Sequence, residues 1–389
     1  MAPPSADSPV AHHGQEEPVA LQTTINSEAG SLLSKLYPTP LVYSGSLDQY
    51  ESFDLTTVIG KEFPTVQLTE LLKDDAKIKD LAITVSQRGV VFFRNQDINI
   101  EEQKTLAQKL GELSGKPETS KLHRHAVSNS KRGIPVDDKG TLDDEVSIVS
   151  SDTPRESDSN KFADRAPRKT ANQVWHSDDS HPKSDKLIYY SITFENIPSD
   201  YATLKVVSLP GKVGGDTLFA SGYDAYDRLS PSWQDFLEGL TATHFQPSFN
   251  KIVAEKGIEL IEENRGTPEN TGTHFQAVHP VIRTNPVTGW KSIFGAGQQV
   301  EHGWINNVTD RESELIKGYL LETIASNYDL QVRIKWNQND LAIWDNRSVF
   351  HTAISDYKKK RIAHRVLSLG ERPYLDKNSS SRREALGGL

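Results

Sequence analysis

Regular hydrophobic patterns begin only after an N-terminal stretch that is rich in Pro, Ser, Glu and Ala. This stretch has too little apolar surface to offset the entropy lost on ordering, so it predicts a disordered tail over residues 1–37. A short apolar run that follows a glycine, 89–93, then predicts a buried strand. Asn99 and Glu102 precede leucines at helical spacing, which predicts a helix that begins with a capping box.

From about residue 174 onward the pattern changes to short alternating runs separated by turn signals such as Pro-Gly and Asn-Pro. Two helices interrupt these runs, one beginning at Ser230-Pro231 and one at the capping box of Thr309 and Glu312. A period of two predicts strands, here over 203–209, 280–284, 291–295, 331–336, 341–344, 348–353 and 362–369. Many short strands with few helices predict a mainly β fold with flanking helices, of the sandwich, barrel or jelly-roll type.

The segment between these two regions, 128–173, is mostly polar, apart from a strand candidate at DEVSIVSS. Long polar segments inside a domain are either disordered loops or lids. The patterns together predict one domain over 38–375, preceded by the tail and followed by a C-terminal tail over 376–389.

Composition narrows the class of protein. The chain has 44 Lys and Arg against 53 Asp and Glu, a net charge of −9, which argues against a nucleic-acid binder. The absence of cysteine excludes disulfides, thiolate metal sites and thiol nucleophiles. No apolar run approaches the roughly 18–20 residues of a membrane span, and the N-terminus lacks the features of a secretory signal. We therefore expect a soluble cytoplasmic enzyme that has neither a nucleic acid nor a membrane as partner.

One pair among the twelve histidines and the acidic residues suggests metal chemistry. His176 and Asp178 form the chain's one H-x-D arrangement, and on a strand both side chains would point to the same face. An imidazole beside a carboxylate is two-thirds of the facial triad that holds non-haem Fe(II). His351, at the end of an apolar run, is a candidate third ligand. Each histidine could equally be an ordinary surface or core residue.

Three further residues become interesting beside such a site. Arg361 and Arg365 follow His351 at an even separation that keeps them on one face of a strand, where they would suit an anion. Thr217 follows a tight Gly214-Gly215 turn and could donate its hydroxyl proton to a carboxylate. The alternatives are a solvated Lys-Arg charge run and an ordinary glycine turn.

Over roughly residues 55–375 the chain resembles the TauD/TfdA family of Fe(II)- and 2-oxoglutarate-dependent dioxygenases, in particular its fungal members. The matching strings are LAQKLGEL at 106–113, WHSD at 175–178, GGDTLFASGYDAYDRLS at 214–230, HPVIRTNPVTG at 279–289, NDLAIWDNRSVFH at 339–351 and HRVLSLGERPY at 364–374. The resemblance implies a double-stranded β-helix, also called a jelly roll.

The resemblance also implies roles for individual residues. It makes His176, Asp178 and His351 the ligands of Fe(II), and it places the distal carboxylate of 2-oxoglutarate at Thr217 and Arg361. Arg365 matches the arginine that binds the sulfonate in the taurine-oxidising members of the family. The remaining substrate positions that match are His125 and Asn172.

Two departures from the family pattern affect what can be expected. Ser128 stands where the taurine-oxidising members have a tyrosine, which puts taurine itself in doubt. The segment 179–191 separates the metal motif from the sequence that usually follows it. Because the insertion begins beside a metal ligand, one hypothesis is that it displaces Asp178, for which Asp179 and Asp185 are poor substitutes, and that it lowers activity if it disrupts the strand. Equal iron affinity and turnover in the full chain and in a 179–191 deletion variant would refute this hypothesis.

The implied reaction uses O2 to hydroxylate a C–H bond of a small anionic substrate while 2-oxoglutarate is converted to succinate and CO2. The main expectation is an alkyl sulfonate substrate, from which sulfite and an aldehyde are released. One alternative is the same chemistry on an amino acid or other carboxylate in secondary metabolism. Two further hypotheses are a non-redox, metal-binding jelly roll and a chain made inactive by the insertion. A homo-oligomer remains open.

Overall fold

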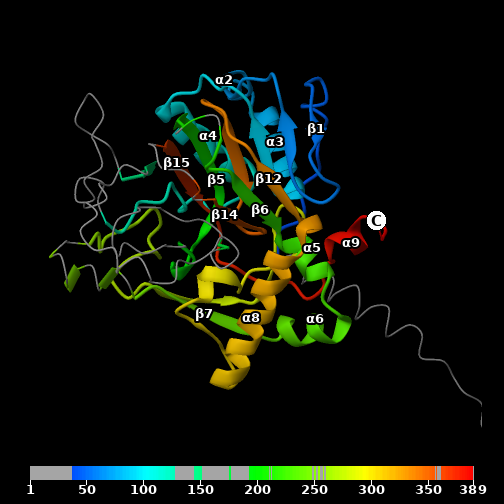
Figure 1. The fold of residues 1–389 in the computed structure, drawn as a ribbon, viewed down its shortest axis with the longest axis vertical. Coiled ribbons are helices and arrows are strands. Elements are labelled where there is room, and N and C mark those ends of the chain that lie inside the picture. Colours follow the sequence, from blue (N-terminus) through cyan, green and yellow to red (C-terminus); the bar gives the residue numbers. More distant parts are fainter. Residues whose placement is uncertain are drawn as a thin grey trace, which may run out of the picture. The chain divides into compact units, whose positions relative to one another are not determined.

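The largest sheet has seven strands, in the order β1-β2-β3-β13-β5-β15-β4. Figure 1 labels three of them, β1, β5 and β15. Its strands are β1 (Phe53–Asp54), β2 (Lys61–Phe63), β3 (Val90–Phe93), β4 (Val146–Ser150), β5 (Ser199–Ser208), β13 (Leu341–Asp345) and β15 (Ile362–Leu369). One compact unit extends from Pro40 to Leu389. The computed structural model describes residues 37–127, 144–150, 175–176, 192–209, 211, 213–247, 249–250, 253–254, 257, 260–354, 356 and 361–388.

Strand β3 is buried on both of its faces. Val90 and Phe92 belong to an apolar cluster that includes residues of a second sheet. Val91 and Phe93 belong to a different cluster, which includes residues of two helices, α3 (Asp75–Arg88) and α4 (Ile100–Leu113). A strand covered on both faces has a continuous apolar run rather than alternation, which explains the sequence VVFF. The predicted strand at 89–93 is confirmed.

The second sheet has the antiparallel order β12-β6-β14. Its strands are β6 (Thr217–Ser221), β12 (Gln331–Ile334) and β14 (Val349–Ala353). Two smaller sheets complete the strands of the described residues: β7 (Thr241–Phe245), β8 (Gln276–Pro280) and β11 (Trp304–Ile305) form one, and β9 (Ile282–Thr284) and β10 (Lys291–Ile293) form the other. Each strand predicted after residue 200 overlaps one of these strands or one of the larger sheet.

The two predicted capping boxes are present. In α4 the Asn99 side chain accepts from the Glu102 amide while Glu102 bonds back to Asn99. Thr309 and Glu312 do the same at the start of α8 (Asp310–Ser326). The remaining helical segments are α2 (Leu68–Leu71), α5 (Gly222–Asp227), α6 (Pro231–Glu238), α9 (Arg382–Ala385) and the 3₁₀ turns η4 (Ile192–Phe194), η5 (Gly297–Val300) and η6 (Tyr328–Leu330). Proline occupies the start of α6, as predicted.

The architecture is mixed α/β with several sheets, so helices contribute more than the expectation of a mainly β fold allowed. Helix α3 was not among the predicted helices, although the side chain of Asp74 caps its start and Gly89, at φ 74°, follows its end. Residues 376–388 carry α9, whose start has a capping box formed by Ser381 and Glu384, so the compact unit continues past residue 375. No helix in the described part of the chain is long and apolar enough to cross a membrane.

Several predictions concern segments outside the described residues. They are the tail over 1–37, of which Tyr37 alone is described, the insertion 179–191, and most of the loop region 128–173. The strand candidate inside that loop region is confirmed, because β4 pairs with β15.

Candidate active site

His176 and His351 lie side by side because their backbones form an isolated antiparallel bridge. The amide of His176 donates to the carbonyl of His351 at 3.0 Å, and the amide of His351 donates back at 2.6 Å. Residues that exchange both hydrogen bonds direct their side chains to the same face of the pair. The centres of the two imidazole rings are accordingly 4.3 Å apart. Two histidines far apart in the sequence thus meet, as predicted.

Aromatic side chains surround His351. On β14 it lies opposite Phe219 of β6, whose ring stacks on the imidazole at a centre-to-centre distance of 5.7 Å. The ring of Trp344, from β13, lies 5.0 Å from the same imidazole. Both aromatic residues are buried, so they fix the orientation of the imidazole and exclude water from one side of it.

A cavity opens beside the two histidines. Its described lining combines the two imidazoles, three aromatic rings and two guanidinium groups. The lining residues are Val149, His176, Leu204, Thr217, Phe219, Trp336, Trp344, His351, Ala353, Arg361 and Arg365. Arg361 and Arg365 therefore face one cavity, as their even spacing predicted, although the pairing of β15 with β5 is irregular just after Arg361.

The Gly214-Gly215 turn brings Thr217 to this cavity. Both glycines have positive φ, 92° and 78°, a conformation that other residues adopt only with strain. The chain then enters β6 directly, with Thr217 as the first residue of the strand. The hydroxyl oxygen of Thr217 accepts a hydrogen bond from Trp336 Nε1 at 3.0 Å. The predicted turn is thus present, and it leads to a polar side chain at the cavity.

A second cavity shares Arg365 with the first. Apart from Arg365, its described lining is apolar, aromatic or histidine: His123, His125, Ala126, Ile192, Phe194 and Phe249. Phe249 packs edge-on against both His125 and Phe194. His125, which the resemblance assigned to substrate binding, is therefore at this cavity, with its Nδ1 held at the backbone of Val127.

Charge in the first cavity favours an anionic ligand. Arg361 and Arg365 are 4% and 2% exposed, so solvent screens their charge little. Buried guanidinium groups form their strongest hydrogen bonds with carboxylate or phosphate groups.

The paired imidazoles fit two of the positions expected for the metal. Imidazoles that bind one ion at adjacent positions, about 2.1 Å from each nitrogen, have ring centres roughly 4–5 Å apart, and the observed separation of 4.3 Å matches. The third predicted ligand, Asp178, lies outside the described residues, as does the substrate candidate Asn172. Consistent with this, the described residues contain no group of three or more potential ligands.

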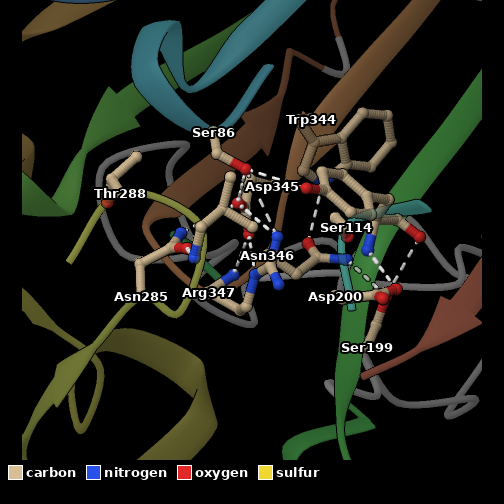
Figure 2. Close-up of polar contacts among 12 residues, drawn as sticks. Ser86, Ser114, Ser199, Asp200, Asn285, Thr288, Trp344, Asp345, Asn346 and Arg347 are labelled. Atoms are coloured by element: carbon tan, nitrogen blue, oxygen red, sulfur yellow. Dashed lines mark hydrogen bonds and ion pairs between the residues drawn. The ribbon is translucent and has the colours of Figure 1, made fainter. Parts of the chain in front are cut away.

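A buried polar network supports the wall of the cavity from behind. Trp344 Nε1 donates to the side chain of Asn346 at 2.7 Å, and Asn346 donates to Ser199 at 2.9 Å. Figure 2 shows this network together with its continuation, in which the Arg347 side chain donates two hydrogen bonds to Asp345. Burial alone would raise the pKa of Asp345, but the charge and hydrogen bonds of Arg347 outweigh it and hold that pKa below its usual range.

Sequence reasoning missed three aromatic residues of the cavity, Phe219, Trp336 and Trp344. Each belongs to a strand or lies within two residues of one, and Trp336 and Trp344 lie within predicted alternating runs. Their pattern alone is also that of ordinary core residues, so it carried no separate signal for a site.

Comparison with known proteins identifies the family. Residues 51–367 match the model described as taurine catabolism dioxygenase TauD, TfdA family. The chain is 40% identical to the alpha-ketoglutarate-dependent dioxygenase esdpJ of Penicillium shearii, over 92% of this chain and 99% of that protein. It is 34% identical to a putative alpha-ketoglutarate-dependent sulfonate dioxygenase of Schizosaccharomyces pombe, over 84% of this chain and 71% of that protein.

The chain belongs to the TauD/TfdA family. It is an alpha-ketoglutarate-dependent dioxygenase, which sets aside the hypothesis of a non-redox binding protein; alpha-ketoglutarate is another name for 2-oxoglutarate. Among solved structures, the fold is similar to that of AAD-2 in complex with Mn(II) and N-oxalylglycine. The TM-score is 0.54 at 19% identity, and the match covers 84% of this chain and 99% of that one.

Proposed function

We propose that His176 and His351, together with Asp178, hold Fe(II), and that Thr217 and Arg361 bind the distal carboxylate of 2-oxoglutarate. The observation that carries this proposal is the bridge between the two histidines beside a cavity that Thr217 and Arg361 also line. Bound Fe(II) would supply the O2 chemistry that couples conversion of 2-oxoglutarate to succinate and CO2 with hydroxylation of a substrate C–H bond.

The protein's contribution would be placement and exclusion of water. The backbone bridge fixes the two imidazoles, and Phe219 and Trp344 pack against the imidazole of His351. Thr217 can donate its hydroxyl proton to one carboxylate oxygen, and Arg361 can donate N–H groups to the other. We infer further that the β12-β6-β14 sheet and the larger sheet, which share an apolar cluster, form the family's double-stranded β-helix.

We propose that the substrate is an organic acid with a carboxylate and an apolar body, which is the chemistry expected of secondary metabolism. Arg365 lines both cavities, so a carboxylate held there would sit at their junction. Ile192, Phe194 and Phe249 give the second cavity apolar walls, which suit a body less polar than that of taurine. The 40% identical relative is named a dioxygenase without mention of sulfonates.

A small alkyl sulfonate is the second candidate. The name of the 34% identical relative favours it, because that protein is described as a putative sulfonate dioxygenase. Arg365 could bind a sulfonate as readily as a carboxylate, so the arginine does not separate the two candidates.

Matched pairs of acids that carry the same organic group on a carboxylate or on a sulfonate would test the choice. We would measure succinate formed per enzyme with 3-phenylpropionate against 2-phenylethanesulfonate, and with β-alanine against taurine, and would score sulfite for both sulfonates. We expect more succinate from 3-phenylpropionate than from its sulfonate partner, and little from taurine. The highest turnover with taurine, accompanied by sulfite, would instead establish the second candidate.

An anaerobic titration with Fe(II) and 2-oxoglutarate tests the site independently of any substrate. We expect the metal-to-ligand charge-transfer absorption of a chelated 2-oxoglutarate. If the absorption does not develop, the assignment of the cavity as the iron and 2-oxoglutarate site is wrong.

A further inference from the structure

Trp336 contacts both side chains to which the 2-oxoglutarate carboxylate has been assigned. Its Nε1 donates to the hydroxyl oxygen of Thr217 at 3.0 Å. Its ring centre lies 6.0 Å from the guanidinium carbon of Arg361, at the limit of a cation–π contact. All three side chains line the same cavity and are at most 6% exposed. The indole of Trp336 thus contacts both the neutral donor, Thr217, and the charged donor, Arg361, of the proposed carboxylate site.

The hydrogen bond constrains the direction of the Thr217 proton. An indole N–H is a donor only, so the hydroxyl oxygen of Thr217 must act as the acceptor in this pair. The hydroxyl proton then points away from Trp336 and is available for a different acceptor. A threonine without this partner could rotate its hydroxyl among several staggered positions.

Trp336 is itself held firmly. It follows β12 by two residues and belongs to the apolar cluster that includes residues of both large sheets. Its ring packs edge-on against Phe92 of β3 at a centre-to-centre distance of 6.3 Å. The position of the indole is therefore set by the core and not by any ligand.

We propose that Trp336 is a positioning residue for 2-oxoglutarate, which it orders by orienting the Thr217 hydroxyl as a donor to the distal carboxylate and by supporting Arg361. This inference rests on the proposed function, and it adds a residue that touches the two carboxylate-binding side chains. A purely structural Trp336 would contribute to folding stability without affecting 2-oxoglutarate affinity through Thr217.

A double-mutant cycle distinguishes these two roles. The variants are Trp336→Phe, which keeps an aromatic ring but removes the donor, Thr217→Val, which removes the hydroxyl at nearly constant shape, and the two combined. The dissociation constant of 2-oxoglutarate would be measured anaerobically with Fe(II), by the charge-transfer absorption. KM for 2-oxoglutarate and kcat would be measured in parallel.

We expect each single variant to weaken 2-oxoglutarate binding by about three- to tenfold, as for the loss of one neutral hydrogen bond, with kcat changing less than KM. The dissociation constant of 2-oxoglutarate in the combined variant should be at most twice that in Thr217→Val. Thr217→Ser, which retains a hydroxyl, should restore most of the affinity lost in Thr217→Val. Trp290→Phe is the matched control, because Trp290 is also buried but lines neither cavity.

Three outcomes would overturn the inference. The first is an unchanged dissociation constant of 2-oxoglutarate in Trp336→Phe. The second is a combined variant in which the fold-increase of this constant equals the product of the fold-increases in the two single variants. If Trp336→Phe does not fold, an unchanged affinity in Thr217→Val is the third. An absence of 2-oxoglutarate binding in the wild type would instead overturn the proposed function, and this inference with it.

Discussion

Arg265 donates two parallel hydrogen bonds to Glu195, from Nε to Oε1 at 2.5 Å and from Nη2 to Oε2 at 2.9 Å. Both side chains are buried. Nη1 of the same guanidinium donates to the carbonyls of Ile261 and Gly272. The pair therefore fastens the 261–272 segment to the residue that follows Phe194, which is part of the second cavity's wall.

Breaking this pair should destabilise the protein strongly. Burial already raises the pKa of Glu195 in spite of Arg265, and Arg265→Ala would leave that carboxyl buried without its cation. We expect the free energy of unfolding to fall by about 3–5 kcal/mol, measured by urea denaturation. Arg372→Ala is the control, since its pair with Glu269 is exposed and should contribute no more than about 1 kcal/mol. A similar decrease in the free energy of unfolding in both variants would contradict the conclusion that the buried pair of Arg265 and Glu195 stabilises the fold strongly.

Removing either imidazole of the proposed metal site should abolish iron binding and succinate formation. His176→Ala and His351→Ala each delete one of two adjacent nitrogen ligands, whose rings are 4.3 Å apart. Iron content after reconstitution is the direct measurement, and succinate release is the second. His274→Ala, at an exposed histidine, should retain both. Full iron content in His351→Ala would exclude this histidine as a ligand.

The two arginines of the first cavity should have separable effects. Arg361→Ala should raise KM for 2-oxoglutarate strongly, because a buried carboxylate that loses its cation costs about 3–5 kcal/mol. Arg365→Ala should raise KM for the organic substrate more than KM for 2-oxoglutarate. Steady-state kinetics with each substrate varied in turn measures both effects, and each variant is the control for the other. If both variants raise the same KM, one of the two assignments is wrong.

Two buried histidines outside the active site should make the fold sensitive to acid. The rings of His244 and His279 are 5.0 Å apart and fully buried. Burial, opposed by hydrogen bonds to backbone carbonyls and assisted by the positive charges of Arg283 and Arg372, lowers the pKa of His279 to about 4. Burial and His279 also lower the pKa of His244.

The sign of this effect follows from proton binding. As pH falls below about 6.5, the unfolded chain binds protons that the folded chain does not. The free energy of unfolding is therefore greatest above that pH and decreases progressively between about pH 6.5 and about pH 4. His279 alone should account for about 3 kcal/mol of this loss. Urea denaturation at pH 7 and pH 4.5 should show a smaller loss for His279→Gln than for the wild type. The exposed His302→Gln should behave as the wild type does.

Local signals in the sequence were sufficient for much of the fold. The capping boxes at Asn99 and Thr309 act within one turn, and the glycines before Thr217 are demanded by backbone geometry at that point. The joining of His176 to His351 depends instead on pairing between segments distant in the sequence. No local pattern specifies such pairing: the H-x-D motif made His351 a candidate partner of His176, and the resemblance to a family supported that choice.

The same limit explains the role missed for Trp336. Its position at the end of an alternating run is equally typical of a core residue, and only the folded chain places its indole at Thr217. Helix α3 was missed for another reason. Its sequence, DAKIKDLAITVSQR, does place Ile78, Leu81, Ala82 and Val85 at helical spacing behind the Asp74 cap, so the local signal was present and was overlooked.

Because Arg365 lines both cavities, its position can determine which carbon of the substrate is hydroxylated. If this guanidinium anchors the acid group of the substrate, the group becomes a fixed pivot, and the number of bonds from it decides which carbon reaches the histidine pair. Chain length would then act as a molecular ruler: homologous acids should be hydroxylated at a constant distance from the carboxylate, whatever lies beyond that carbon.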